Sequence, residues 1–183
     1  MNIEIIENKY RKLIDKALAI MTELNDPVHG LEHMKGVVGN TILLLEKVSD
    51  ADKEVCLLAA YWYDVGRVCG KPGHGLKSAQ MLKEELKTLE YDAEFIEKCY
   101  KAIYKHDETD IPDTLEGIVI KDADKIDYLG VKRWKECINR NVRTPRIDQN
   151  PKSKLLLDCS KTIYDKKAKE WLSYLESVVM KRE

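Results

Sequence analysis

Apolar residues recur at intervals of three and four along almost the whole chain, and no stretch alternates with a period of two over a useful length. This spacing predicts amphipathic helices. Their expected ranges are 2–24, 27–48, 74–89, 92–105, 114–131, 134–140 and 154–179. Residues 52–68 are apolar nearly all round, which predicts a helix that is buried on every side. The pattern as a whole predicts an all-α fold.

Turn-forming residues mark the breaks between these helices. Asp26 is a suitable N-cap for the second helix, with Pro27 at its first helical position. Glycine and proline within residues 70–73 predict a loop, and two prolines within residues 141–151 predict another. Each break is short enough to keep consecutive helices close together.

The length suits one domain. A chain of 183 residues buries roughly 70% of its unfolded surface on folding, so a sizeable core is possible. We find no internal repeat and no low-complexity tract. We therefore expect a single compact helical domain over residues 1–183, with a core that carries the candidate chemistry at about 26–130 and a C-terminal helical extension over 131–183.

Composition narrows the functional classes. The chain has 31 Lys and Arg against 32 Asp and Glu, and its formal net charge is −1. This balance argues against binding of a nucleic-acid polymer, which depends on neutralising many phosphates, but it allows a locally basic pocket. The sequence contains no run of about 18 apolar residues, so it predicts no membrane-spanning helix. Five scattered cysteines without a Cys-x-x-Cys pair, and no leader at the amino end, favour a cytoplasmic protein without disulfides or a thiolate zinc site.

Asp64 is the first residue that the fold alone does not explain. It lies within the apolar run CLLAAYWYDV, residues 56–65. A buried carboxylate is costly unless it is paired, protonated or bound to a metal. Arg67, three residues later, is the candidate partner if the role of Asp64 is purely structural.

Two histidines and three aspartates add to this picture. His29 and His33 lie four residues apart on a predicted helix and so share one side of it, although simple hydrogen bonding would explain them equally well. The segment IVIKDADKIDYLG, residues 118–130, does not have the spacing of an EF-hand calcium loop. Asp122 there can be a helix-start residue, whereas Asp124, close to Ile126, is harder to explain as solvated.

The remaining histidines fall at predicted helix ends. His74 opens a helix in GHGLKSAQML, and His106 closes one in AIYKHD, where an imidazolium would also suit the helix dipole. Imidazole and carboxylate ligands together suit Zn, Mn, Fe, Ni or Mg rather than a soft thiolate site. An all-α domain would build such a site inside the bundle from several helices.

In this order, the motifs resemble the HD-domain metal-dependent phosphohydrolases. DPVHGLEHMKGV resembles the first motif of that family, AAYWYDVGR the His-Asp doublet and KDADKIDYLG the last motif. The resemblance implies a divalent metal ion held by His33, Asp64 and Asp124. GHGLKSAQML and AIYKHD resemble two intermediate segments, which implies that His74 and His106 bind a second metal or the substrate.

Tyr63 departs from the family pattern, because the doublet has histidine at this position. A neutral phenol is a poor ligand for a divalent ion compared with imidazole. Three outcomes stay open: water replaces the lost ligand, His29 compensates for it, or the site is inactive and the chain is a binding module.

The resemblance also implies a reaction. A metal-activated water would hydrolyse a phosphoester or phosphoanhydride of a small phosphorylated substrate, and nucleotides are the commonest substrates of the family. Arg67 and Lys125 would neutralise phosphate charge, or would be surface charges paired with Asp122 or Asp127. Tyr63 would be able to donate a hydrogen bond to a phosphate oxygen. The sequence indicates neither the base nor an oligomeric state.

Two other interpretations compete with this one. The first is a catalytically degenerate domain that binds a nucleotide or a protein partner, and Tyr63 motivates it. The second is a zinc metallopeptidase, because HGLEH, residues 29–33, matches the inverted H-x-x-E-H pattern with Glu32 as general base. The peptidase is the weaker of the two, since it leaves Asp64 and Asp124 unexplained.

Overall fold

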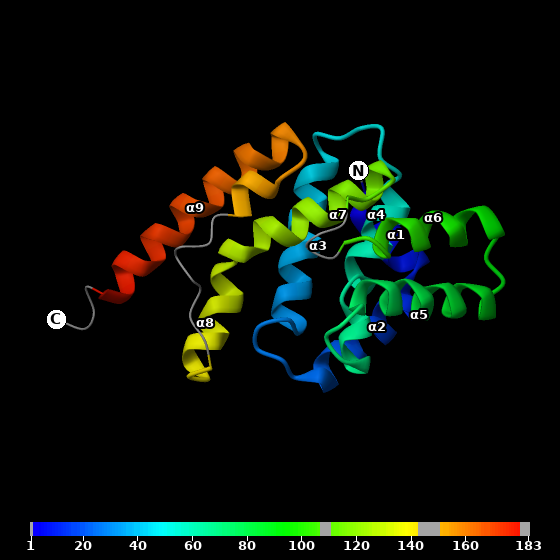
Figure 1. The fold of residues 1–183 in the computed structure, drawn as a ribbon, viewed down its shortest axis with the longest axis horizontal. Coiled ribbons are helices and arrows are strands. Elements are labelled where there is room, and N and C mark those ends of the chain that lie inside the picture. Colours follow the sequence, from blue (N-terminus) through cyan, green and yellow to red (C-terminus); the bar gives the residue numbers. More distant parts are fainter. Residues whose placement is uncertain (1, 107–110, 143–150, 180–183) are drawn as a thin grey trace.

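The computed structural model describes residues 2–106, 111–142 and 151–179, and this part of the chain is entirely helical (Figure 1). The α-helices are α1 (Ile3–Lys9), α2 (Arg11–Leu24), α3 (Leu31–Leu45), α4 (Lys53–Trp62), α5 (His74–Thr88), α6 (Ala93–Ile103), α7 (Leu115–Ile126), α8 (Val131–Asn139) and α9 (Asp158–Val179). Three short 3-10 helices, η1 (Val65–Cys69), η2 (Asp127–Leu129) and η3 (Pro151–Lys154), complete the described elements. The predicted all-α fold is confirmed.

Helix α4 lies at the centre of the bundle, in contact with α2, α3, α6 and α7. Its buried residues lie on all sides, as the continuous apolar run predicts; they are Val55, Cys56, Leu57, Leu58, Ala59, Ala60 and Trp62. Around it, α7 packs across α3, and α5 packs along α6 (Figure 1). Helix α4 therefore carries its C-terminal end, and the residues after it, into the interior.

The predicted second helix begins later than expected. Asp26 does not cap it: the carboxylate accepts hydrogen bonds from the backbone N–H of Val28, at 2.7 Å, and of His29, at 3.1 Å, within a separate turn. Gly30 closes this turn, because a Cβ there would overlap the backbone carbonyl of Asp26. The helix starts only at Leu31, so His29 is not on it and the predicted helical pairing of His29 with His33 is wrong.

Two other predicted helices are also interrupted. The expected helix over residues 2–24 breaks at Tyr10, whose backbone leaves helical geometry while its ring stacks on Phe95 at a centroid distance of 5.6 Å. The expected helix over 52–68 ends at Trp62 and continues as η1. There Gly66 lies so close to the start of α5 that a Cβ would overlap the carbonyl of His74.

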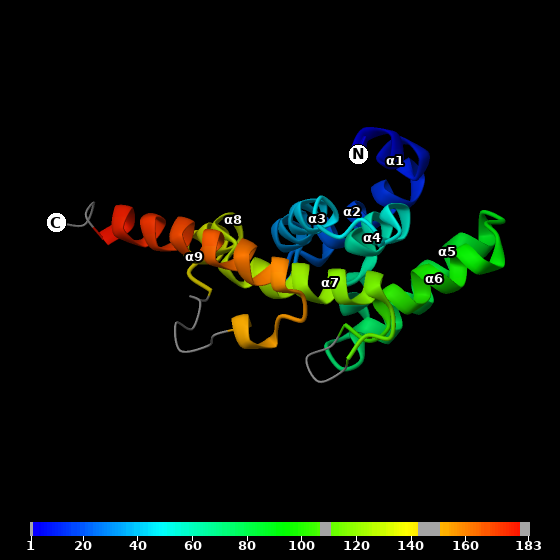
Figure 2. The same cartoon turned by 90° about the horizontal axis from the view of Figure 1, so that it is seen from above.

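The C-terminal part of the chain is attached to α7 through Asp122. This residue is not at a helix start, as the sequence suggested, but is buried in the interior of α7. Its carboxylate accepts hydrogen bonds from the backbone N–H groups of Leu156 and Leu157, at 2.9 Å each. These bonds fix the approach to α9, which then extends past α8 away from the other helices (Figures 1 and 2).

Among the described residues, no helix combines the length and apolarity needed to cross a bilayer. Most of the predicted loop over residues 141–151 lies outside the part of the chain that the structure describes.

The Asp122 contact gives a test of the fold. We expect Asp122→Ala to lower the free energy of unfolding by about 2 to 4 kcal/mol, because two buried N–H groups lose a charged acceptor. Asp122→Asn should cost less, since the amide oxygen still accepts and burial already raises the pKa of this carboxyl. Urea unfolding followed by circular dichroism measures both; equal stability of the alanine variant and the wild type would contradict this role.

Candidate metal centre

Five helix ends meet at one buried place. Asp64 lies two residues after the end of α4, His74 is the first residue of α5, and His106 lies three residues after the end of α6. His33 lies in the first turn of α3, and Asp124 lies in the last turn of α7. Backbone groups at helix ends are already displaced from regular hydrogen bonding, so side chains there can converge without interrupting a helix.

The Asp64 carboxylate is the centre of this group, and it is fully buried. Its Oδ1 lies 3.1 Å from His74 Nε2 and 3.5 Å from His106 Nε2. Its Oδ2 lies 2.6 Å from Arg67 Nε. The ion pair with Arg67 therefore exists, as the structural interpretation of Asp64 requires, but it occupies only one of the two oxygens.

His74 and His106 turn the same ring atom toward Asp64. Their Nε2 atoms are 3.1 Å apart, whereas Nδ1 of His74 lies 3.0 Å from the carbonyl of Lys71 and Nδ1 of His106 lies 2.9 Å from that of Ile103. A carbonyl can only accept, so these contacts place the proton of each neutral ring on Nδ1. The two Nε2 atoms and the carboxylate oxygen therefore need a cation between them: a proton when a ring donates to Asp64, or a metal ion in its place.

A second group lies on the other side of Asp64. His33 Nε2 is 4.0 Å and His29 Nδ1 is 3.8 Å from Asp64 Oδ2. Asp124 Oδ1 lies 3.1 Å from the same nitrogen of His33. Two triads thus bring one ligand atom of each member within 4.8 Å of the others: His29, His33 and Asp64, and Asp64, His74 and His106. Asp124 borders the first triad through His33.

Tyr63 lies between the two triads. Its ring makes edge contacts with His33 and His106, at centroid distances of 5.8 and 5.1 Å. Tyr63 is 1% exposed, and its hydroxyl has no hydrogen-bond partner among the residues that the structure describes. Burial, followed by the charges of Asp64 and Asp124, raises its pKa well above the usual value, so the phenol stays protonated and can donate.

Within the described part of the chain, four buried polar atoms at this place find no hydrogen bond of good geometry: His29 Nδ1, His33 Nε2, Tyr63 Oη and Asp64 Oδ1. Buried polar atoms are rarely left unsatisfied, because each costs about 1 to 3 kcal/mol. Three of the four are imidazole nitrogens or a carboxylate oxygen, which are common ligands of Zn, Mn, Fe and Ni. The residues present therefore fit a divalent cation.

The carboxylates at this place are held ionised. Burial alone would raise the pKa of Asp64, but the contacts with His106 and His74 outweigh it and hold that pKa well below the usual value. Burial also opposes ionisation of Asp124, and there Lys125 leads the contacts that lower the pKa instead. Negative charge is thus available to a cation at any ordinary pH.

The two histidines of the first triad differ. Burial, with a smaller effect of Arg67, lowers the pKa of His29 to about 3, so its imidazole is neutral and can act as a ligand. Burial also acts to lower the pKa of His33, but Asp124 and Asp127 outweigh it and raise that pKa. The carboxylates that favour a proton at His33 would favour a metal ion there for the same electrostatic reason.

The two predicted cations lie beside the triads rather than free on the surface. Lys125 Nζ is 3.1 Å from Asp124 Oδ2, and Arg67 holds Asp64 as described. The alternative pairing of these cations with Asp122 or Asp127 finds no support among the contacts of the described residues, since Asp122 binds the approach to α9 and Asp127 binds His33.

Sequence reasoning missed Asp127 and Arg133, which form a layer behind His33. Asp127 Oδ2 lies 2.6 Å from His33 Nδ1, and Arg133 Nη1 lies 3.7 Å from the same oxygen. The available clue for Asp127 was its spacing of three residues from Asp124, which is typical of neighbours on one side of a helix; in the structure Asp127 comes just after α7, at the start of η2. The sequence contained no clue to the role of Arg133, because a lone arginine is normally expected at the surface.

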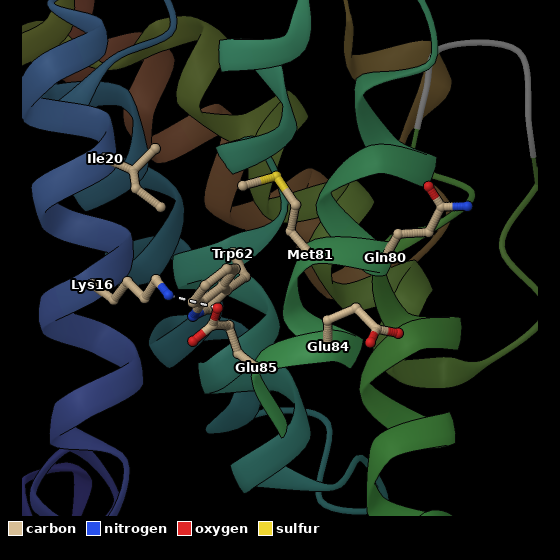
Figure 3. A pocket seen from close by; sticks show the side chains of 7 residues that line it. All are labelled: Lys16, Ile20, Trp62, Gln80, Met81, Glu84 and Glu85. Atoms are coloured by element: carbon tan, nitrogen blue, oxygen red, sulfur yellow. Dashed lines mark hydrogen bonds and ion pairs between the residues drawn. The ribbon is translucent and has the colours of Figure 1, made fainter. Parts of the chain in front are cut away.

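A separate hollow lies between α2, α4 and α5 (Figure 3). It has a volume of about 390 Å³, and an ion pair of 2.6 Å between Lys16 and Glu85 spans it. It is lined by Lys16, Ile20, Trp62, Gln80, Met81, Glu84 and Glu85, and it contains none of the predicted site residues.

Comparison with solved structures finds the same fold over nearly the whole chain. A predicted HD superfamily hydrolase from an uncultured Thermotogales bacterium matches with a TM-score of 0.77 and 17% identity over 100% of both chains. Bacillus subtilis YpgQ, solved in complex with ADP, matches with a TM-score of 0.66 and 17% identity over 94% of both chains. Lin1889 from Listeria innocua matches with a TM-score of 0.60 and 19% identity over 92% of this chain and 94% of the other.

At these identities the structural likeness establishes the fold alone. A search of curated proteins found no match. The model of the HD domain family matches residues 30–129, a segment that begins just before α3 and ends with η2, and that contains His33, Asp64 and Asp124. This segment is more than half of the 183 residues. The chain belongs to the HD domain family.

Proposed function

We propose that the protein is a metal-dependent phosphohydrolase that acts on a small phosphorylated molecule, with a nucleotide as the preferred class. The observation that carries this proposal is the set of unsatisfied buried atoms on His29, His33, Tyr63 and Asp64. A buried set of nitrogen and carboxylate ligands needs a cation. The ADP complex of YpgQ, a protein of the same fold, supports a nucleotide as the substrate of the present protein.

We assign the ligands as follows. His33, Asp64 and Asp124 hold the divalent metal, which is Mn, Fe, Ni, Zn or Mg, and His29 supplies the nitrogen that Tyr63 lacks. The neutral imidazole of His29, 3.8 Å from Asp64, supports this substitution. A bound divalent ion would supply an acidified water and polarise a phosphoryl oxygen.

The remaining residues bind substrate or extend the site. His74 and His106 bind a second metal ion or a substrate group next to Asp64 Oδ1. Arg67 and Lys125 exchange part of their pairing with Asp64 and Asp124 for substrate phosphate, whose negative charge they neutralise. The buried hydroxyl of Tyr63 donates a hydrogen bond to a phosphoryl oxygen. Tyr63 and His106 are buried, and His74, Arg67 and Lys125 are only partly exposed. Bulk water therefore has limited access, which strengthens each interaction.

A binding module without catalysis is the second candidate, and one contact favours it. The Arg67 guanidinium, 2.6 Å from Asp64 Oδ2, already supplies a positive charge where the first triad would hold a metal. The metallopeptidase finds less support. His29 precedes α3 instead of sharing it with His33, and Glu32 pairs with Lys35 at 2.8 Å on the surface.

Hydrolysis is tested by a panel of nucleotides and phosphomonoesters with Mn, Fe, Ni, Zn and Mg. We expect Asp64→Asn to lower kcat/KM on the order of 10³-fold or more, because the variant loses the charge shared by both triads. Glu32→Gln is the matched control and should keep full activity. A wild type that is inactive with every metal, or loss of activity in the Glu32 variant alone, would contradict the proposal.

The role of Tyr63 is tested separately by metal binding. We expect Tyr63→His to tighten binding of Mn or Ni by at least about tenfold, because an imidazole nitrogen would join the first triad. Tyr63→Phe removes only the hydroxyl and should leave metal affinity nearly unchanged. Isothermal titration calorimetry measures both variants, and unchanged affinity in Tyr63→His would show that residue 63 is not at a ligand position.

A further inference from the structure

His33 is held from behind by Asp127. The bond between Asp127 Oδ2 and His33 Nδ1 is 2.6 Å long, and both side chains are buried, with residue exposures of 4% and 2%. The opposite ring atom, Nε2, faces Asp124 and Asp64. One nitrogen of His33 is therefore occupied by a carboxylate, while the other lies toward the candidate ligands.

The space for the Asp127 carboxylate is built by two glycines. A Cβ at Gly36, on α3, or at Gly130, just after η2, would overlap Asp127 Oδ1. Gly39, three residues later on α3, has no atom within 4 Å of where its Cβ would lie. The close approach is thus specific to the slot that receives Asp127 and is not a general property of this helix.

Arg133 reaches the same place from α8, beyond the segment that the family model matches. It is 6% exposed, and its Nη1 lies 3.7 Å from Asp127 Oδ2 and 3.2 Å from His33 Nδ1. A guanidinium can only donate. Arg133 and Asp127 therefore favour opposite protonation states of His33 Nδ1. The Asp127 carboxylate accepts a hydrogen bond and favours a proton on Nδ1, whereas the Arg133 guanidinium donates one and favours a lone pair there.

Distance decides between these two demands. At 2.6 Å, a carboxylate oxygen and a ring nitrogen must share a proton, whereas the guanidinium at 3.2 Å can pair with the carboxylate instead. Asp124 Oδ1 favours a proton on Nε2, but it lies 3.1 Å from that nitrogen, farther than Asp127 Oδ2 lies from Nδ1. The proton of the neutral ring is then on Nδ1, and Nε2 keeps the lone pair that a metal needs.

We propose that Asp127 is a positioning residue for His33, fixing the Nδ1–H tautomer so that Nε2 is presented to the metal, and that Arg133 would impose the opposite tautomer if the Asp127 carboxylate were removed. This inference rests on the proposed function for the use of Nε2, but the tautomer itself does not depend on catalysis. Arg133 places the C-terminal extension in direct contact with the inner side of the site.

The test is nitrogen NMR of metal-free protein labelled with ¹⁵N-histidine, since only four histidines contribute signals. His33→Gln identifies the signals of His33. In the wild type, recorded above the pH at which His33 loses its second proton, we expect Nδ1 protonated and Nε2 unprotonated. In Asp127→Asn the population should shift toward the Nε2–H form, because the amide can turn its N–H toward Nδ1 and Arg133 can donate there. The buried control Asp122→Asn, on the neighbouring helix α7, should leave the His33 signals unchanged.

Metal affinity is the second readout. We expect Asp127→Asn to weaken Mn binding roughly 10- to 100-fold, the range found for partners behind metal ligands. Gly36→Ala should weaken it similarly by expelling the carboxylate from its slot, while Gly39→Ala should not.

Folded Asp127→Asn protein with an unchanged His33 tautomer and an Mn affinity within about twofold of wild type would overturn the proposal. If the wild type binds no metal but Asp127→Asn still shifts the tautomer, the proposed function fails and the positioning role stands.

Discussion

The structure depends on one interaction above all: the burial of the charged Asp64 carboxylate in the centre of a helical bundle. A carboxylate without water needs compensation from every direction. Arg67 meets one oxygen at 2.6 Å, and two imidazole nitrogens approach the other. The ends of α3, α4, α5, α6 and α7 all lie around this charge, so the arrangement of the bundle and the geometry of the site have a common origin.

The compensation around Asp64 is uneven, and this unevenness gives the site its chemistry. Arg67 satisfies one side with a permanent charge, whereas the other side faces two Nε2 atoms whose rings are held at Nδ1 by backbone carbonyls. A protein that needed only stability would pair both oxygens with permanent donors. Two Nε2 atoms directed at a carboxylate oxygen are instead consistent with a cation site.

The helices and the burial of α4 were predictable from the sequence, because both depend on the local spacing of apolar residues. Helical periodicity identified every major helix, and the apolar run around Asp64 correctly indicated burial of α4. The predictions that were wrong concern the exact start or end of a helix, as at Asp26. Nothing in the spacing of Asp26 and His29 distinguishes a helix cap from a separate turn, because both use a carboxylate that accepts backbone N–H groups.

Asp127 and Arg133 were missed for a different reason. Their role depends on a contact between α3 and segments about 100 residues away, and periodicity carries no information about such contacts. The same is true of Gly36, whose lack of a side chain matters only because Asp127 lies against it. Sequence reasoning thus found the histidines and carboxylates that gather around Asp64, and the structure adds the residues that lie behind His33.

The central claim is that the histidines and carboxylates around Asp64 bind a divalent metal. The most direct measurement is an anomalous difference map from crystals grown with Mn²⁺, recorded at a wavelength where manganese scatters anomalously. We expect an anomalous peak for Mn²⁺ in contact with Asp64, next to either His33 and Asp124 or His74 and His106. A well-ordered site with no peak, and with the Arg67–Asp64 pair unchanged, would contradict it.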